Sequence, residues 1–144
     1  MIRTLLLSLV LAASSAGSAL ADGALPNIAG SWAFKSWTYS QCEFGGIANF
    51  SATNEPGVYG CEITARQTCP AVTWVVRQSC TARQSAERIT ITSTIEEFLE
   101  GPVSDQYWPD NFVLSISGPD RMSGSLISHG VHPSEFTRTR GAVS

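Results

Sequence analysis

The chain has 144 residues and a formal net charge of −3, and only 15% of its residues are charged. A chain of this length forms one domain of ordinary size. Its acidic balance excludes a nucleic-acid partner, because contacts with phosphate groups need a positively charged surface.

The first 21 residues have the pattern of a secretory signal peptide. Arg3 precedes an apolar run over residues 5–13, and the small residues Ala19 and Ala21 mark a cleavage site. The run is too short for a transmembrane helix, which needs about 20 residues, and no later stretch is longer. We expect cleavage after Ala21, one domain over residues 22–144, a periplasmic or secreted location and no membrane span.

Apolar and polar residues alternate along most of the remaining chain. Ile89 and Ile91, for example, alternate with Thr90 and Thr92, and this period of two predicts β-strands. Turn signals separate the alternating runs, and Ser85-Ala86 is the predicted turn of one tight hairpin. The expected strands cover residues 30–39, 43–52, 57–67, 72–83, 87–97, 111–117, 121–128 and 132–140.

Eight consecutive strands with mostly short connections predict an antiparallel up-and-down meander. Closure of the meander into a barrel leaves no strand edge unpaired. An eight-stranded barrel has an interior that side chains fill or that holds one small ligand. The predicted fold class is therefore all-β, an eight-stranded antiparallel up-and-down β-barrel.

Four cysteines follow the signal peptide, and an even number in an exported chain predicts two disulfides. A zinc site is the competing interpretation, but no CxxC pair is present and both histidines are distant in the sequence. In the meander, Cys42 and Cys69 fall in turns at the same end of the barrel, and Cys61 falls opposite Cys80 on adjacent strands. We predict the disulfides Cys42–Cys69 and Cys61–Cys80. The rival pairing of Cys42 with Cys61 and Cys69 with Cys80 would span much of the barrel length.

The first and last strands carry two short motifs, Gly30-Ser31-Trp32 and Phe136-Thr137-Arg138. Together with the eight-strand pattern they resemble the calycin superfamily, the lipocalins and their small bacterial relatives. The resemblance implies that Arg138, or else Arg140, stacks on Trp32 and closes one end of the barrel. The Thr-Asp-Tyr triplet of lipocalins is absent. The few residues after Arg140 leave no room for the C-terminal helix of typical lipocalins, so we expect a minimal barrel.

A candidate site lies at the end of the barrel where Cys42 and Cys69 are expected. The longest predicted connection, from about Phe98 to Asp110, joins this end and is longer than an ordinary hairpin loop. One mouth of the barrel would bring together aromatic and polar side chains from three places. These are this loop, the inward face of the strands and the connection between the seventh and eighth strands. The candidate ligand-binding residues are Trp74, Gln78, Tyr107, Trp108 and His129.

Each of these residues also has a structural interpretation. Tyr107 and Trp108 would cap the core beneath the loop, and Asp110 and Asn111 would cap a turn by accepting backbone N–H groups. Gln78 and Ser93 are predicted opposite each other, so they would satisfy one another by hydrogen bonding. The histidines at 129 and 132 would be ordinary surface residues of a loop, and the acidic residues around 96–110 would be a solvated surface.

The sequence contains no nucleophile elbow and no HExxH motif, so we expect no enzymatic activity, no cofactor and no metal. The leading interpretation is an exported binding protein that holds a small, mostly apolar molecule at or in the barrel. The alternative is a protein-binding module, such as an inhibitor of an exported protease or other hydrolase. The outline also resembles the bacterial periplasmic metalloprotease inhibitors. Such a module would use the segment Asp22–Ile28 or the long loop as its probe.

Overall fold

A computed structural model describes residues 25–38 and 40–140. The predicted signal peptide, residues 1–21, lies outside the described residues. The eight strands are β1 (Gly30–Ser36), β2 (Glu43–Ala52), β3 (Val58–Thr68), β4 (Thr73–Ser85), β5 (Arg88–Glu100), β6 (Asn111–Gly118), β7 (Arg121–Ser128) and β8 (Gly130–Arg138). In the described part of the chain no helix is long and apolar enough to cross a bilayer.

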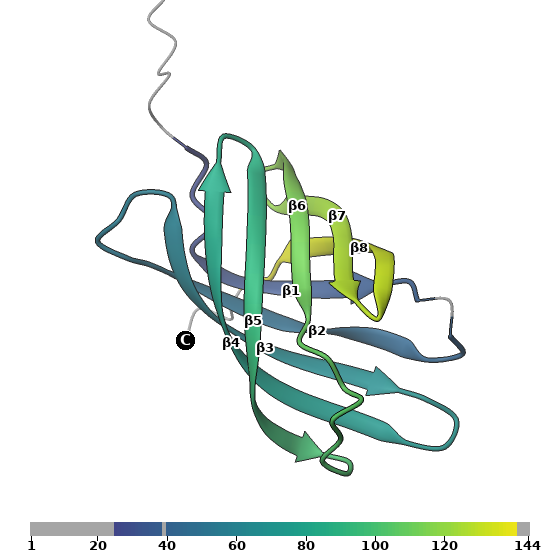
Figure 1. Cartoon of the computed structure of the whole chain (residues 1–144). Helices are drawn as coiled ribbons and strands as arrows, with labels where there is room; N and C mark the ends of the chain where they lie inside the picture. The colour runs from purple at the N-terminus through teal and green to yellow at the C-terminus, as the bar shows by residue number, and fades with distance from the viewer. Residues whose placement is uncertain (1–24, 39, 141–144) are drawn as a thin grey trace, which may run out of the picture.

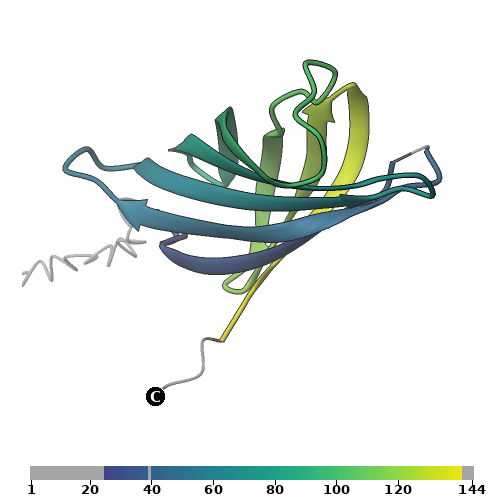
Figure 2. The same ribbon diagram turned by 90° about the horizontal axis from the view of Figure 1, so that it is seen from below.

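Each strand pairs antiparallel with the next, and β1 pairs with β8, so the sheet closes into a barrel. Strands β1 and β2 cross β6 and β7 at a large angle (Figures 1 and 2), as the right-handed twist of a small closed sheet requires. The prediction of an all-β, eight-stranded antiparallel barrel is confirmed, and this architecture fits a lipocalin-like fold.

Two strand boundaries differ from the prediction in ways that affect the candidate site. Strand β5 continues to Glu100, so the long loop covers only residues 101–110. The alternation breaks at Glu96-Glu97 because the register between β4 and β5 shifts there, which is the mark of a β-bulge. Strand β8 begins at Gly130, so His132 lies in a strand and not in a loop.

The inward side chains fill one end of the barrel with a packed aromatic core. Phe34 stacks on Phe136 with ring centroids 5.1 Å apart, and Phe112 meets both rings edge-on. The same buried cluster includes Ile89, Ile91, Leu114, Met122 and Phe50. Such packing explains why the interior is closed toward the end that carries the chain termini.

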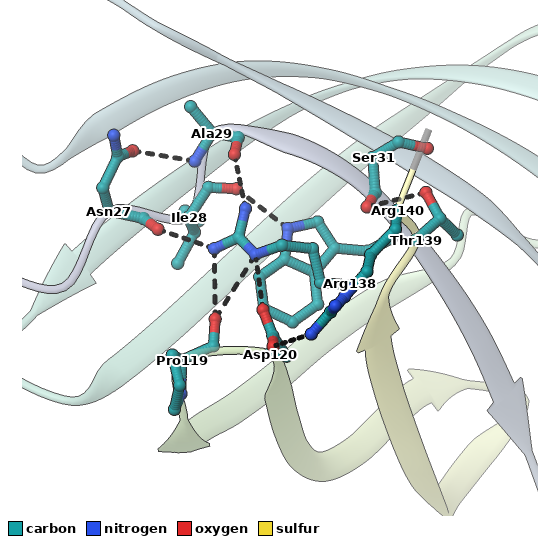
Figure 3. A network of polar contacts seen from close by, with 10 residues as sticks. Asn27, Ile28, Ala29, Ser31, Pro119, Asp120, Arg138, Thr139 and Arg140 are labelled. Atoms are coloured by element: carbon teal, nitrogen blue, oxygen red, sulfur yellow. Dashed lines mark hydrogen bonds and ion pairs between the residues drawn. The ribbon is translucent and has the colours of Figure 1, made fainter. Parts of the chain in front are cut away.

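Arg138 closes that end of the barrel (Figure 3). Its guanidinium lies 4.4 Å from the centre of the Trp32 ring and donates to the carbonyls of Ala29 (2.7 Å) and Asn27 (2.8 Å). Arg138 also forms an ion pair with Asp120 at 3.3 Å. This is the contact that the calycin resemblance implied for Arg138, whereas Arg140 is exposed and lies 3.9 Å from Asp120. The segment before β1 is thereby held across the end of the barrel.

Two disulfides staple the sheet, with the predicted partners. Cys42 is bonded to Cys69 and links the β1–β2 turn to the β3–β4 turn. Cys61 is bonded to Cys80, and these residues face each other on β3 and β4. The Cys42–Cys69 bridge lies at the end of the barrel opposite Arg138. The long β5–β6 loop, at the bottom of Figure 1, belongs to the same end. This end of the barrel therefore carries the least regular part of the fold.

Candidate functional site

A cavity of about 620 Å³ opens at the end of the barrel that holds the Cys42–Cys69 bridge. Its volume is within the range of small-molecule sites. Its ring-bearing lining residues are Phe44, Trp74, Tyr107, Trp108, His129 and His132. The other lining residues are Thr38, Ser40, Gln67, Ser104, Gln106, Asp110, Leu126 and Ser128. All five predicted ligand-binding residues lie at this end, and four of them line the cavity directly.

Gln78, the fifth candidate, is fully buried beneath the cavity and binds Asp110. Its Nε2 donates to Oδ2 of Asp110 at 2.5 Å, and its Oε1 accepts from the Asp110 backbone N–H at 2.9 Å. The Tyr107 hydroxyl donates to the same Oδ2 at 2.9 Å. Gln78 therefore holds the loop end in place, and it reaches a ligand only through Asp110.

The predicted contact between Gln78 and Ser93 was wrong. Ser93 faces Cys80 and Gln78 faces Ile95, because the hairpin turns at Ala86 and Glu87 instead of Ser85 and Ala86. Ala86 takes the left-handed conformation with φ 55°, which suits a tight hairpin turn. The one-residue change in the turn centre moves each cross-strand pair between the turn and Gln78 by two positions.

Strands β5 and β6 separate above Ile91 and Phe112, which are their last paired residues. Beyond this pair, side-chain hydrogen bonds connect the two chain segments in place of backbone pairing. Asn111 Oδ1 accepts the Ser93 backbone N–H at 2.8 Å, and Ser93 Oγ donates to the Asp110 carbonyl at 2.6 Å. The predicted turn-capping role of Asn111 was therefore wrong, because its side chain accepts a backbone N–H of strand β5 and not of a turn.

Asp110 does not have the turn-capping role that was predicted for it. Its side chain is 2% exposed, and burial raises the pKa of its carboxyl from the ordinary 3.8 to about 6. The hydrogen bonds from Gln78 and Tyr107 and the nearby His129 act in the opposite direction but do not cancel the effect of burial. Burial and the adjacent Asp110 carboxylate raise the pKa of Tyr107 well above its usual range, so its hydroxyl stays a donor.

The two neighbouring aromatics of the loop have different positions. Tyr107 is buried and packs edge-on against Trp74 and Phe98, with ring centroids 6.2 and 5.9 Å away. Trp108 is 52% exposed and lies over the His129 ring with centroids 4.1 Å apart. Tyr107 therefore covers the core, while Trp108 and His129 form the rim of the cavity.

Trp74 and His129 also hold the loop in place. Trp74 Nε1 donates to the Pro102 carbonyl at 2.9 Å, and His129 Nε2 contacts the Gln106 carbonyl. These contacts attach the loop to β4 on one side and to the β7–β8 turn on the other. The mouth is therefore a built structure with defined side-chain positions.

The acidic residues near the loop face outward, apart from Asp110. Glu97 pairs with Arg77 at 3.3 Å, and Glu100 pairs with Arg66 at 3.5 Å. These pairs are solvent-exposed and contribute little stability. Within residues 25–38 and 40–140, no group of three or more His, Cys, Asp or Glu side chains could hold a metal ion.

Sequence reasoning missed that Asp110 is the buried polar group of the site. A usable signal was present, because Asp110 lies two residues before Phe112 and four before Leu114. Strand alternation therefore continues the inward face of β6 to Asp110. Phe44 and His132 also line the cavity, and the same parity rule places them on the inward faces of β2 and β8.

No family model matches the chain, and no curated protein matches it. Among solved structures it is similar to a designed protein described as "De novo design of a fluorescence-activating beta barrel". The two chains are 19% identical, and the match covers 77% of this chain and 93% of the designed chain with a TM-score of 0.48.

Proposed function

We propose that residues 22–144 form an exported, non-enzymatic binding protein of calycin-like type that holds a small, mostly apolar ligand. The proposal rests on the aromatic-lined cavity of about 620 Å³ above a filled core. A filled core at one end and a rimmed cavity at the other is the arrangement that ligand binding in a small barrel needs. Trp74, Tyr107 and Trp108 supply the contact area, and Asp110 supplies the polar group.

Native mass spectrometry of the protein, purified gently from the cell fraction into which it is exported, tests this function. We expect extra mass that leaves on denaturation. Trp108→Ala should reduce the retained mass because it removes the rim above the cavity. Trp37→Ala is the matched control, since Trp37 is about as exposed as Trp108 and lies outside the cavity lining. A bare mass in the wild type, with no uptake of added apolar probes, would contradict the proposal.

The second candidate function is binding of another protein through the long loop. Val103 is 84% exposed, and Leu99 and Trp108 are each about half exposed, so apolar side chains are concentrated at one tip. Val103→Ser should then weaken inhibition of an exported hydrolase and leave ligand retention unchanged.

The N-terminal segment is a poorer probe than the loop. Gln84 donates to the Pro26 carbonyl at 2.9 Å, and Ile28 is buried against the core. Deleting Asp22–Ile28 would therefore damage the barrel itself and could not test inhibition by this segment.

A further inference from the structure

We propose that the ligand of this cavity is a small organic cation, an amine with an apolar body whose ammonium group binds the carboxylate of Asp110. This inference rests on the proposed function, because it assigns the ligand class of the same cavity. It specifies the charge of the ligand, which the proposed function does not.

The charge of the cavity is the first observation. Among its lining residues Asp110 is the one carboxylate, and none is lysine or arginine. The stretch from Ile89 to Asp120, which includes the whole loop, contains no basic residue. Arg66 and Arg77 lie on the outer surface, where they pair with Glu100 and Glu97. An anionic ligand would therefore meet a carboxylate with no lysine or arginine beside it.

The burial of Asp110 is the second observation. Its side chain is 2% exposed, and its carboxylate accepts the two hydrogen bonds that Gln78 and Tyr107 donate to Oδ2. These donors are neutral, so they satisfy the oxygen without balancing its charge. A buried charge is costly unless it is paired. An ammonium group that reaches this carboxylate from the cavity would supply a paired positive charge and a hydrogen-bond donor.

The aromatic lining is the third observation. Phe44, Trp74, Tyr107 and Trp108 surround the same space. Aromatic rings bind the apolar body of a ligand, and their faces attract a cation once water is excluded. A carboxylate among aromatic rings is thus suited to an amine more than to a neutral or anionic molecule of the same shape.

The test uses three probes of similar size and different charge: 2-phenylethylamine, 2-phenylethanol and 3-phenylpropanoate. Binding to the wild-type protein is measured by isothermal titration calorimetry at about pH 8, well above the pKa of about 6 of the Asp110 carboxyl, so that this group is ionised. We expect the amine to bind at least about tenfold more tightly than the alcohol, a ratio typical of one close charge pair. We expect the anion to bind most weakly.

Asp110→Asn should abolish the preference for the amine over the alcohol. The variant keeps an oxygen acceptor for Gln78 and Tyr107, and circular dichroism checks its fold. Asp105→Asn is the matched control, because it removes one exposed carboxylate from the same loop. This control should keep the full preference for the amine.

A pH series on the wild type tests the same point without any variant. The preference should fall as the pH is lowered through about 6, because Asp110 then becomes protonated while the amine stays charged. The titratable groups around Asp110 are Tyr107, His129 and, across the cavity, His132. The Asp110→Asn variant is measured over the same series, and its ratio of amine to alcohol affinity should stay near one throughout. A fall in this ratio as steep as in the wild type would assign the pH dependence to a group other than Asp110 and overturn the inference.

The outcomes separate the two proposals. Equal binding of amine and alcohol, or tightest binding of the anion, would overturn the cation assignment and leave the cavity as a binding site. A preference that survives Asp110→Asn would also overturn it. Failure of all three probes to bind would overturn the cation assignment together with the proposed function.

Discussion

The Gln78 amide forms two hydrogen bonds with Asp110, one to the backbone N–H and one to the carboxylate. These bonds join β4 to the residue just before β6, at the level where β5 and β6 no longer pair. The Gln78 side chain thus anchors the residue that precedes β6 to β4 and fixes the floor of the cavity.

Gln78→Ala should destabilise the protein by about 3 kcal/mol, because it leaves a buried N–H and a buried carboxylate with fewer partners. Urea denaturation measures the free energy of unfolding. Gln106→Ala is the control on the exposed part of the loop and should change stability by no more than about 0.5 kcal/mol. A Gln78→Ala variant as stable as this control would show that the two hydrogen bonds contribute little.

Asp110 should make the protein less stable as the pH rises from about 4 to about 6. The pKa of its carboxyl in the folded protein, about 6, lies above the ordinary 3.8, so between these values the folded chain binds more protons than the unfolded chain. The free energy of unfolding therefore falls with increasing pH in this window. A pKa difference of about 2 corresponds to about 3 kcal/mol.

Urea denaturation of wild type and Asp110→Asn over this pH window isolates the effect of the one carboxyl. The variant lacks the titrating group, so its free energy of unfolding should increase relative to that of the wild type as the pH rises. Asp105→Asn controls for the general loss of a carboxylate. Parallel pH profiles for wild type and Asp110→Asn would contradict the assignment of the raised pKa to Asp110.

Arg138→Met should cost about 2–4 kcal/mol, since it removes charge-assisted hydrogen bonds to Ala29 and Asn27 and the contact with Trp32. Arg140→Met is the matched control at an exposed site and should cost about 0.5 kcal/mol or less. Thermal unfolding followed by tryptophan fluorescence distinguishes them. Equal melting temperatures would mean that Arg138 does not stabilise the closed end.

The two disulfides should be separable by their effect on binding. Replacing either pair by serine should cost about 3 kcal/mol, because the chain segments that they close are 27 and 19 residues long. Removing Cys42–Cys69 should also weaken ligand retention, since that bridge ties two turns at the mouth. Removing Cys61–Cys80 should not, because that bridge joins adjacent strands below the mouth. Native mass spectrometry at a temperature where both variants are folded makes the comparison.

The eight strands could be predicted from the sequence because inward and outward residues alternate with a period of two. The alternation through Ile89 and Ile91 is an example, and the parity of the cysteines followed from the same rule. Such signals depend only on neighbouring residues, so they can be read from the sequence without knowledge of the fold. The sequence by itself therefore determined the strand order, the closure of the barrel and the end where the long loop lies.

Tertiary structure alone decided how the mouth is built. The pairing of Gln78 with Asp110 depends on where β5 leaves β6 and on a hairpin turn centred one residue later than Ser85-Ala86 suggests. Burial gives Asp110 its raised pKa, and the loop path separates the buried Tyr107 from the half-exposed Trp108. These properties depend on contacts between residues distant in sequence, and a one-residue change in the centre of the β4–β5 turn is enough to move the partner of Gln78 from Ser93 to Ile95.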